Sequence, residues 1–309
     1  MSQPTYDVLI IGGGPAGLTA GLYTSRAKLK TLLVERMILG GQVMTTTKVE
    51  NYPGFPGGID GPELMMRFQE HCQEFGLEVT TGEVQGLIDR GETKVLIVDG
   101  EEVLARTVII TTGAEPAKLD VPGEQQFVGR GVSYCATCDG AFFRNATIAI
   151  VGGGDTAAEE ALFLTRFAKK VFLIHRRDQL RATRILQDRV FACDRIEPVW
   201  NSVVEQVEGD NSGLKSVVLK DRVTGATRSL ELEGLFVAIG VIPKAHFLAD
   251  VLELTADGHI QTDAECRTSI PGVFAAGDVR KKILKQIATA VGDGAVAAIM
   301  AEKYLMEQN

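Results

Sequence analysis

The sequence predicts an α/β fold in which two similar units are combined and the second is inserted into the first. The chain has 309 residues, which exceeds one domain of typical size. Hydrophobic residues make up 45% of the chain and glycine occurs 34 times, as expected where many strands turn tightly into helices. Most directly, a short apolar strand followed by a glycine-rich turn, a helix and a second strand occurs twice.

The first unit begins with an apolar run over residues 6–11, which predicts a buried parallel strand. The turn GGGPAG follows at 12–17, a helix is expected over 18–26, and the next strand ends in Glu35. Glycines with this spacing let the backbone approach a pyrophosphate at a helix N-terminus, and the carboxylate can accept hydrogen bonds from ribose hydroxyls. A glycine turn alone is a weak signal. Together with its flanking strand, helix and acid, it predicts a Rossmann-like dinucleotide-binding unit.

The second unit repeats this order but lacks the acid after its second strand. It has a strand over 147–151, the turn GGGDTA at 152–157 and, after a helix and a second strand, Arg176 and Arg177. Arg181 lies one helical turn later. A guanidinium cluster can bind a 2′-phosphate, which a carboxylate would repel, so NADP(H) is favoured. NAD(H) and a plain solvated basic surface are the alternatives.

Three later strands that end in glycine indicate where the chain passes between the units. They lie at 108–114, 235–240 and 272–278, and a long amphipathic helix is expected from 286 to 306. The simplest arrangement places linkers near 115–119 and 243–247, with the second unit between them. The first unit is then discontinuous in sequence.

Composition and charge argue against several classes of function. The net charge of −8 disfavours nucleic-acid binding. The sequence shows neither a secretion signal nor an uncharged apolar stretch of roughly 18 residues, so we expect a cytoplasmic protein without membrane contact. The cysteines are odd in number and mostly scattered, which argues against a secreted disulfide framework and leaves Cys72, Cys193 and Cys266 as ordinary thiols.

Cys135 and Cys138 alone share a local motif, C-x-x-C. A dithiol with this spacing can close a small disulfide ring and so accept and release two electrons. Half of a zinc site is the alternative for such a pair. No second C-x-x-C or histidine pair accompanies it, so we expect no metal. The next residue, Asp139, is the nearest titratable side chain.

Together these residues resemble the low-molecular-weight thioredoxin reductases along essentially the whole chain. The motifs that carry the resemblance are GGGPAG, GGQ at 40–42, VEN at 49–51, TTGA at 111–114, GRGVSYCATCDG at 129–140, GGGDTA, HRRDQLR at 175–181 and GVFAAGDV at 272–279. The resemblance implies an FAD-binding domain formed by residues 1–116 and 246–309. It also implies an NADP(H)-binding domain over 117–245 that carries the C-x-x-C, and a homodimer. Electrons would pass from NADPH through FAD and the dithiol to thioredoxin.

The resemblance also implies roles for individual residues. Cys138 would face the flavin, Cys135 would attack the partner's disulfide, and Asp139 would be the general acid, its alternative role being a turn cap before Gly140. The residues expected to bind FAD are Gly12, Gly14, Pro15, Ala16, Gly17, Glu35, Gly40, Gly41, Gln42, Asn51, Val84, Thr112, Gly113, Gly277, Asp278, Lys285, Gln286 and Ile287. Those expected to bind NADP(H) are Gly152, Gly154, Asp155, Thr156, Ala157, His175, Arg176, Arg177, Arg181, Ile239 and Gly240. Arg130, Phe142 and Phe143 would contact thioredoxin, with burial in the core as the alternative for the phenylalanines.

Because the dithiol and the NADP(H) site belong to one inserted domain, both have to reach the same flavin in turn. We therefore expect this domain to rotate between the half-reactions. The flavoprotein component of alkyl hydroperoxide reductase is a close alternative, disfavoured because the first strand already starts at Tyr6. A flavin dithiol oxidase and a ferredoxin-linked relative are disfavoured because the second nucleotide motif is retained. A redox-sensing flavoprotein without turnover is the alternative from another class.

Overall fold

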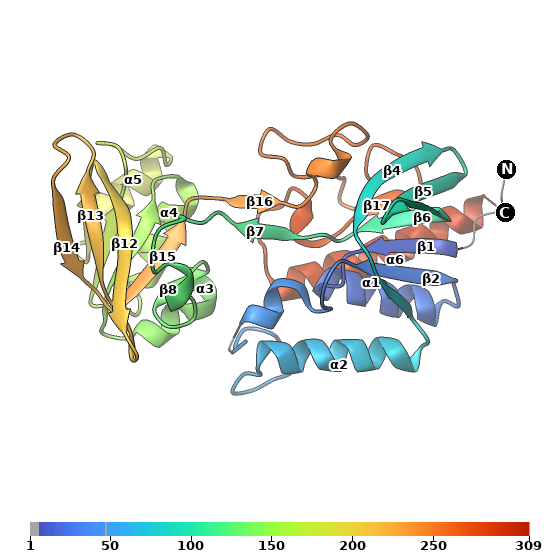
Figure 1. The fold of residues 1–309 in the computed structure, drawn as a ribbon, viewed down its shortest axis with the longest axis horizontal. Helices are drawn as coiled ribbons and strands as arrows, with labels where there is room; N and C mark the ends of the chain where they lie inside the picture. The colour runs from blue at the N-terminus through green and yellow to red at the C-terminus, as the bar shows by residue number, and fades with distance from the viewer. Residues whose placement is uncertain (1–5, 47, 309) are drawn as a thin grey trace. The chain divides into compact units, whose positions relative to one another are not determined.

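The structure is a computed structural model that describes residues 6–46 and 48–308 (Figure 1). The chain divides into two compact units, one formed by Met1–Glu115 with Ile242–Asn309 and the other by Pro116–Val241. The boundaries predicted from the sequence lie after residues 116 and 245, which is one and four residues later in the chain than in the structure. The crossing segments are the short strands β7 (Ala114–Pro116) and β16 (Val241–Pro243), which pair with each other.

The first unit is built on a sheet with the strand order β3-β2-β1-β6-β5-β4, and β17 pairs with β6. The strands β1, β2, β3, β6 and β17 are joined in parallel, whereas β4, β5 and β6 form an antiparallel meander. The bounds are β1 (Tyr6–Ile11), β2 (Thr31–Glu35), β3 (Glu78–Thr81), β4 (Val84–Arg90), β5 (Thr93–Val98), β6 (Glu101–Ile110) and β17 (Val273–Ala275). The helices are α1 (Pro15–Arg26), α2 (Gly61–Glu74) and α6 (Ile287–Glu307).

Both faces of this sheet are buried, as expected for strands that are apolar at successive positions. Val8, Ile10 and Leu33 point to the face covered by α1, α2 and α6. Leu9 and Ile11 point to the opposite face, where they pack with apolar residues of the meander and of the segment 245–260. The short 3-10 helices of this unit are η1 (Gly41–Thr45), η4 (His246–Leu248) and η5 (Gly277–Val279).

The second unit contains a parallel sheet with the order β11-β10-β9-β15-β8 and a separate antiparallel sheet, β12-β13-β14. The parallel strands are β8 (Val132–Ser133), β9 (Thr147–Gly152), β10 (Lys170–Ile174), β11 (Ile196–Val199) and β15 (Gly234–Ala238). The antiparallel strands are β12 (Ser202–Asp210), β13 (Gly213–Asp221) and β14 (Thr227–Glu231). The helices are α3 (Ala136–Asp139), α4 (Asp155–Leu164) and α5 (Arg184–Phe191), with the 3-10 helices η2 (Gln125–Phe127) and η3 (Gly140–Phe143).

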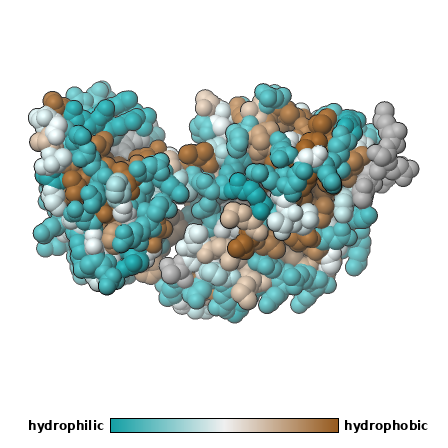
Figure 2. Space-filling model, in the orientation of Figure 1, coloured by the Kyte–Doolittle hydropathy of each residue, from teal (hydrophilic) through white to brown (hydrophobic). Residues whose placement is uncertain are grey.

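The parallel sheet of the second unit is also covered on both faces. Ile148 and Ile150 pack with α4 and α5, while Ala149 and Val151 pack with valines and leucines of the antiparallel sheet. The sequence predicted the first layer but not the second. On the face drawn in Figure 2, hydrophilic residues predominate and apolar ones form small groups.

The predicted fold class, with one Rossmann-like unit inserted into another, is confirmed. Several predicted elements differ from the structure at their ends. The first helix starts at Pro15 rather than at residue 18, because proline is well suited to the first position of a helix. The last helix ends at Glu307 instead of 306. No helix within residues 6–46 and 48–308 has the length and apolar character needed to span a bilayer.

Gly294 of α6 shows how closely the helices of the first unit pack. A Cβ at this position would lie 2.3 Å from the backbone oxygen of Ala16, at the start of α1. We expect Gly294→Ala to lower the free energy of unfolding by about 2 kcal/mol, measured by urea denaturation, because backbone atoms have to move. Gly292→Ala on the same helix is the control. Its Cβ meets nothing within 4 Å, so it should stabilise the protein by up to about 1 kcal/mol. Equal effects of both variants would contradict the packing argument.

Candidate functional site

The first glycine turn lies between β1 and α1, and one of its residues, Gly14, borders open space. Gly12 has a φ of +100°, and a Cβ on Gly17 would lie 1.9 Å from the oxygen of Gly12, so the helix meets the turn only if residue 17 is glycine. At Gly14, by contrast, a Cβ would meet only the Cα of Gly41, at 4.0 Å. Gly14 is the N-cap of α1 and provides no side-chain cap. The first N–H groups of the helix therefore border a space suited to an anion.

Glu35 supports this turn from the end of β2. Its Oε2 accepts a hydrogen bond from the N–H of Gly13 at 2.7 Å, and its Oε1 accepts one from the N–H of Met37 at 3.0 Å. Each carboxylate oxygen has a further lone pair, so binding of ribose hydroxyls stays a prediction. The structure adds a second task for Glu35, which is to hold the turn in place.

Asp278 provides a test of whether the first unit fits a bound cofactor. It follows β17 in η5, and its Oδ1 is buried without a hydrogen-bond partner among the described residues. Burial raises the pKa of this carboxyl, while Lys282, 3.6 Å from Oδ1, lowers it. A buried acceptor without a donor is costly. A hydroxyl group of a polyol chain would satisfy it, so this residue fits the flavin cofactor that the sequence predicts.

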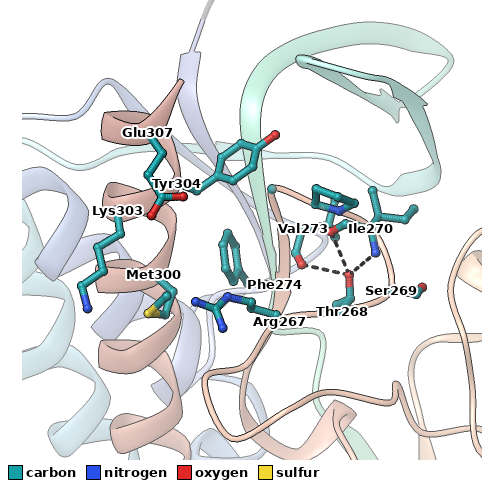
Figure 3. A pocket seen from close by; sticks show the side chains of 12 residues that line it. Arg267, Thr268, Ser269, Ile270, Val273, Phe274, Met300, Lys303, Tyr304 and Glu307 are labelled. Atoms are coloured by element: carbon teal, nitrogen blue, oxygen red, sulfur yellow. Dashed lines mark hydrogen bonds between the residues drawn. The ribbon is translucent and has the colours of Figure 1, made fainter. Parts of the chain in front are cut away.

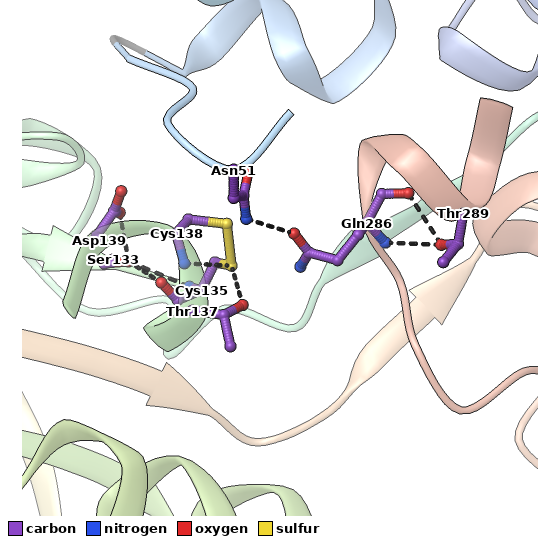
Figure 4. The surroundings of a disulfide bond; sticks show 8 residues. All are labelled: Asn51, Ser133, Cys135, Thr137, Cys138, Asp139, Gln286 and Thr289. Atoms are coloured by element: carbon purple, nitrogen blue, oxygen red, sulfur yellow. Dashed lines mark hydrogen bonds between the residues drawn. A yellow bond between two sulfur atoms is a disulfide. The ribbon is translucent and has the colours of Figure 1, made fainter. Parts of the chain in front are cut away.

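Asn51 and Gln286 come together although they are 235 positions apart in sequence. The Nδ2 of Asn51 donates to the Oε1 of Gln286 at 2.9 Å (Figure 4). Gln286 is also the N-cap of α6, where it forms a capping box with Thr289. Lys285 and Ile287 flank it on either side, and burial lowers the pKa of Lys285.

The remaining predicted residues of the first unit lie on short connections. Gly40, Gly41 and Gln42 form the start of η1, and Thr112 and Gly113 follow β6. The Oγ1 of Thr112 donates to the backbone oxygen of Lys244 at 2.6 Å. Val84 begins β4, two positions after Gly82, whose N–H donates to the oxygen of Glu35 at 3.0 Å, so Val84 lies near the end of β2. Pro15 and Ala16 form the first turn of α1.

The second glycine turn repeats the packing of the first with different neighbours. A Cβ on Gly152 would lie 2.5 Å from the Cβ of Ala157, and a Cβ on Gly153 would lie 2.2 Å from the ring of His175. At Gly154, the N-cap of α4, a Cβ would meet nothing within 4 Å. Glycine is thus needed for packing at the first two positions, while the third stays accessible.

The backbone holds the basic segment against this turn. The N–H of Arg181 donates to the oxygen of Gly153 at 2.6 Å, and the N–H of Thr183 donates to the Oδ1 of Asp155, also at 2.6 Å. Arg181 is exposed, as are Arg176 and Arg177. The predicted guanidinium cluster therefore lies beside the second cradle. Thr156 is exposed in the first turn of α4, and Ile239 and Gly240 follow β15.

His175 differs from its arginine neighbours because it is buried, with 3% of its surface exposed. Its ring lies under Gly153, and its Nε2 has no hydrogen-bond partner among the described residues. Burial lowers its pKa, and the nearby arginines lower it further. The neutral, buried imidazole packs against the glycine turn and supports it, whereas the exposed arginines are available to bind an anion.

Cys135 and Cys138 form a disulfide across α3, with their Cα atoms 5.3 Å apart (Figure 4). Cys135 is the N-cap of α3, and its Sγ accepts a hydrogen bond from the N–H of Cys138 at 3.2 Å. Both residues are partly exposed. The predicted redox pair is therefore formed on the second unit. No cluster of metal-ligating side chains occurs in the part of the chain that the structure describes.

Asp139 follows the disulfide directly in sequence, and Ser133 is hydrogen-bonded both to Asp139 and to Cys135. Its Oδ2 accepts a hydrogen bond from the Oγ of Ser133 at 2.6 Å, and the same Oγ accepts one from the N–H of Cys135 at 3.1 Å. Burial raises the pKa of Asp139 and the hydrogen bond from Ser133 lowers it. A carboxyl whose pKa is raised is a better proton donor near neutral pH. The sequence analysis missed Ser133, although its place two residues before the first cysteine was a usable signal.

Glu160 is a second carboxyl near α3, and its role was not predicted from the sequence. It lies on α4, among residues that pack against α3, and is half-buried. Burial raises its pKa to about 7, Glu159 adds to this effect, and the backbone N–H of Ala136, between the two cysteines, lowers it. Two carboxyls with raised pKa values therefore lie next to α3.

The residues predicted to contact thioredoxin differ in their surroundings. Phe142 is 54% exposed. Phe143 packs edge-on against Phe236, with ring centroids 5.2 Å apart, and so belongs in part to the core. Arg130 donates from Nη2 to the backbone oxygen of Asn211 at 2.7 Å. Phe142 is the member of this set that is most available to a partner.

A cavity of about 260 Å³ lies apart from the predicted cofactor residues, between α6 and the segment 267–274 (Figure 3). Lys303 and Tyr304 from α6 and Arg267 and Phe274 from the segment are among its lining residues. None of the predicted site residues lines it.

Two dinucleotide cradles and a disulfide on one chain define an oxidoreductase that couples nucleotides to a dithiol. In agreement, residues 6–294 match the family model described as pyridine nucleotide-disulphide oxidoreductase. The thioredoxin reductase of Listeria innocua is 48% identical over 305 residues, which cover 99% of this chain and 95% of that protein. The thioredoxin reductase of Bacillus subtilis is also 48% identical, with 99% and 96% covered.

Solved structures agree with these sequence relatives. Thioredoxin reductase from Streptococcus pyogenes matches with a TM-score of 0.93 at 47% identity, covering 98% of each chain. Lactococcus lactis thioredoxin reductase in the FR conformation matches with a TM-score of 0.68 at 48% identity, covering 98% of this chain and all of the other. The chain therefore belongs to the thioredoxin reductase family, as the sequence motifs predicted.

The Ser133–Asp139 hydrogen bond leads to a prediction about pH. Because this bond lowers the pKa of Asp139, its loss in Ser133→Ala should raise that pKa further. Asp139 then stays protonated to higher pH, so the alkaline decline in disulfide-reductase activity should move upward by about one pH unit. Steady-state rates between pH 6 and 9 measure this shift. A decline that moves to lower pH would contradict the assignment.

The raised pKa of Glu160 predicts how stability depends on pH. Because the folded protein favours the neutral carboxyl, the stability contributed by that form is fully present below the unfolded pKa of about 4.5. It is lost as the pH rises through about 7. Glu160→Gln removes this titration, so the variant should gain about 2 kcal/mol relative to the native protein between pH 5 and 8. Urea denaturation at each pH measures the gain, and Glu159→Gln on the exposed side of α4 should show much less.

Proposed function

We propose that this chain reduces a thioredoxin with electrons from NADPH, through FAD and the Cys135–Cys138 disulfide. The reaction converts NADPH, a proton and the disulfide of thioredoxin into NADP⁺ and the dithiol of thioredoxin. The observation that carries the proposal is that one unit holds both the disulfide and a nucleotide cradle with an exposed guanidinium cluster. The names of the relatives support thioredoxin as the acceptor.

FAD would be held by the first unit. The open position at Gly14 suits its pyrophosphate, and the buried Oδ1 of Asp278 suits a hydroxyl of its ribityl chain. Asn51 and Gln286 would border the ring system through their paired amides. When bound, the flavin supplies the ability to accept a hydride and to pass two electrons on to a disulfide.

NADPH would be held by the second unit. The first turn of α4 accepts the pyrophosphate at Gly154, and Arg176, Arg177 and Arg181 bind the 2′-phosphate. The backbone bonds from residues 181–183 to the turn keep the two parts of this site together. The position that Glu35 occupies at the end of β2 corresponds to His175 after β10, so no carboxylate stands there. These features support NADPH over NADH.

The dithiol would act in two exchange steps after its reduction. The thiolate of Cys135 attacks one sulfur of the thioredoxin disulfide, forming a mixed disulfide and releasing the other sulfur as a thiolate. Asp139 donates a proton to the thiolate that leaves. Cys138 then attacks Cys135, which re-forms the internal disulfide and releases the second thiolate of thioredoxin. Ser133 orients Asp139 throughout. Phe142 and Arg130 would contribute to the docking surface.

The inserted unit would rotate between these half-reactions. It carries both the disulfide and the NADPH cradle, and both have to meet the same flavin, which the other unit holds. Two solved relatives with 47% and 48% identity match this chain with TM-scores of 0.93 and 0.68, a spread that differences in domain orientation among relatives would produce. We also propose that the protein is a cytoplasmic homodimer, in which a second copy covers apolar residues exposed on α6, such as Ile299 and Met306.

Separate assays of the two half-reactions test this function. Anaerobic NADPH should bleach the flavin rapidly, and NADH should do so at least about tenfold more slowly, because the guanidinium cluster has no phosphate to bind. Cys135→Ser should keep flavin reduction by NADPH and lose thioredoxin turnover. Cys193→Ser, which changes a free thiol of the same unit, should leave both unchanged.

Two results would overturn the proposal. Normal thioredoxin turnover by Cys135→Ser would exclude the dithiol as the electron carrier. A flavin that stays oxidised with NADPH but is reduced by ferredoxin would show that the proposed donor is wrong.

A further inference from the structure

Asp293 of α6 is the centre of a buried ion network in the first unit. Its Oδ1 accepts a hydrogen bond from the Nη1 of Arg280 at 3.1 Å. Its Oδ2 accepts one from the Nζ of Lys282 at 3.0 Å and one from the N–H of Gly277 at 3.1 Å. The side chains of Arg280, Lys282 and Asp293 are 11%, 12% and 17% exposed. Removing one partner from such a buried pair is costly, because it leaves a charge without compensation.

Further hydrogen bonds fix the two cations. The Nε of Arg280 donates to the Oγ1 of Thr262 and its Nη2 to the backbone oxygen of Asp263, both at 2.7 Å. The Nζ of Lys282 donates to the Oγ1 of Thr289 at 3.2 Å. Neither cation is free to follow a neighbour that moves, so the network imposes its geometry on the turn to which Asp293 is bonded.

That turn contains Asp278, the residue whose buried Oδ1 accepts no hydrogen bond from the described residues. Gly277, which donates to Asp293, has a φ of +78°, and a Cβ there would lie 3.0 Å from the Cβ of Ala16 in the first glycine cradle. Lys282 lies between the two carboxylates, hydrogen-bonded to Asp293 and 3.6 Å from the Oδ1 of Asp278. The network thus joins the first glycine turn, the turn at 277–279 and the Oδ1 of Asp278, which forms an ion pair with Lys282.

We propose that Asp293 is a positioning residue for the flavin cofactor, acting through Gly277 and Lys282 to orient the carboxylate of Asp278 toward a hydroxyl of the cofactor's polyol chain. The inference rests on the proposed binding of FAD. Positioning and a simple effect of charge predict opposite changes in the affinity for FAD. Asp293→Asn removes a negative charge close to the site of an anionic dinucleotide, so charge alone predicts tighter binding. Loss of positioning predicts weaker binding.

The experiment removes the flavin from the full chain and titrates the apoprotein with FAD, following the quenching of flavin fluorescence. Asp293→Asn should bind FAD at least about tenfold more weakly than the native protein. Lys282→Met, which keeps the aliphatic stem, should weaken binding by a similar factor. Asp250→Asn, the same change at an exposed position of this unit, should stay within about twofold of the native value.

The midpoint potential of the bound flavin provides a second readout that lost packing would not produce. Removing a negative charge in Asp293→Asn should raise the potential, and removing a positive charge in Lys282→Met should lower it, because reduction adds negative charge to the flavin. Opposite shifts would show that both charges act at the flavin. Together with weaker FAD binding by Asp293→Asn, which charge alone does not predict, they support positioning, whereas shifts in the same direction or none would overturn it.

Unchanged or tighter FAD binding by Asp293→Asn would also overturn the inference. Because the substituted residues lie in the first unit, the urea unfolding transition and the far-ultraviolet circular dichroism of each apoprotein variant report whether that unit has folded. If Asp293→Asn fails this check, Lys282→Met decides, and unchanged FAD affinity in that variant would refute the role. If the folded native apoprotein does not bind FAD, the proposed function fails instead.

Discussion

The close contact between a glycine turn and the helix that follows it is the constraint on which both nucleotide sites depend. In each unit, the helix can pack against the strand and turn only if a particular residue is glycine. A Cβ on Gly17 would collide with Gly12, and a Cβ on Gly152 would collide with Ala157. A different glycine, Gly14 or Gly154, then lies at the N-cap with open space in front of it. Packing and ligand access are thus divided between neighbouring positions. This division explains why the motif needs glycines at fixed spacing rather than a glycine-rich turn in general.

Burial raises the pKa of carboxyls in both units, but the groups that oppose this effect differ between the two units. Beside the disulfide, Asp139 and Glu160 receive hydrogen bonds from a serine and from a backbone N–H, respectively, which oppose the effect of burial on their pKa values. In the first unit, Lys282 and Lys285 oppose the effect of burial on Asp278. The first environment favours carboxyls that can give up a proton during dithiol exchange. The second places two lysines near a carboxyl that would accept a hydrogen bond from a ligand, although burial still leaves the pKa of this carboxyl raised.

Local sequence predicted those parts of the fold and site that are determined within a few residues. Strands, glycine turns, the guanidinium cluster and the C-x-x-C each leave a contiguous signal, and the fold class follows from their order. The antiparallel sheet over residues 202–231 was missed, because it lies between two recognisable segments without a motif of its own. Glu160 and Asp293 were missed because their roles come from neighbours brought close only by folding, whereas the partners of Ser133 are local in sequence and its position was a usable signal. For the same reason, sequence alone could not show that Glu35 holds its own turn or that His175 is buried under Gly153.

The two sites also differ in how their positive charges are presented, and this difference suits the two proposed cofactors. Arg176, Arg177 and Arg181 are exposed, so salt and water screen them and their contribution to binding is moderate. A nucleotide that enters oxidised or reduced and leaves after each turnover requires such a reversible site. Lys282 and Arg280 have only 12% and 11% of their side-chain surface exposed, and both donate hydrogen bonds to protein acceptors. They contribute orientation rather than an open positive surface, which suits a cofactor that stays bound through many turnovers while the nucleotide exchanges at the other unit.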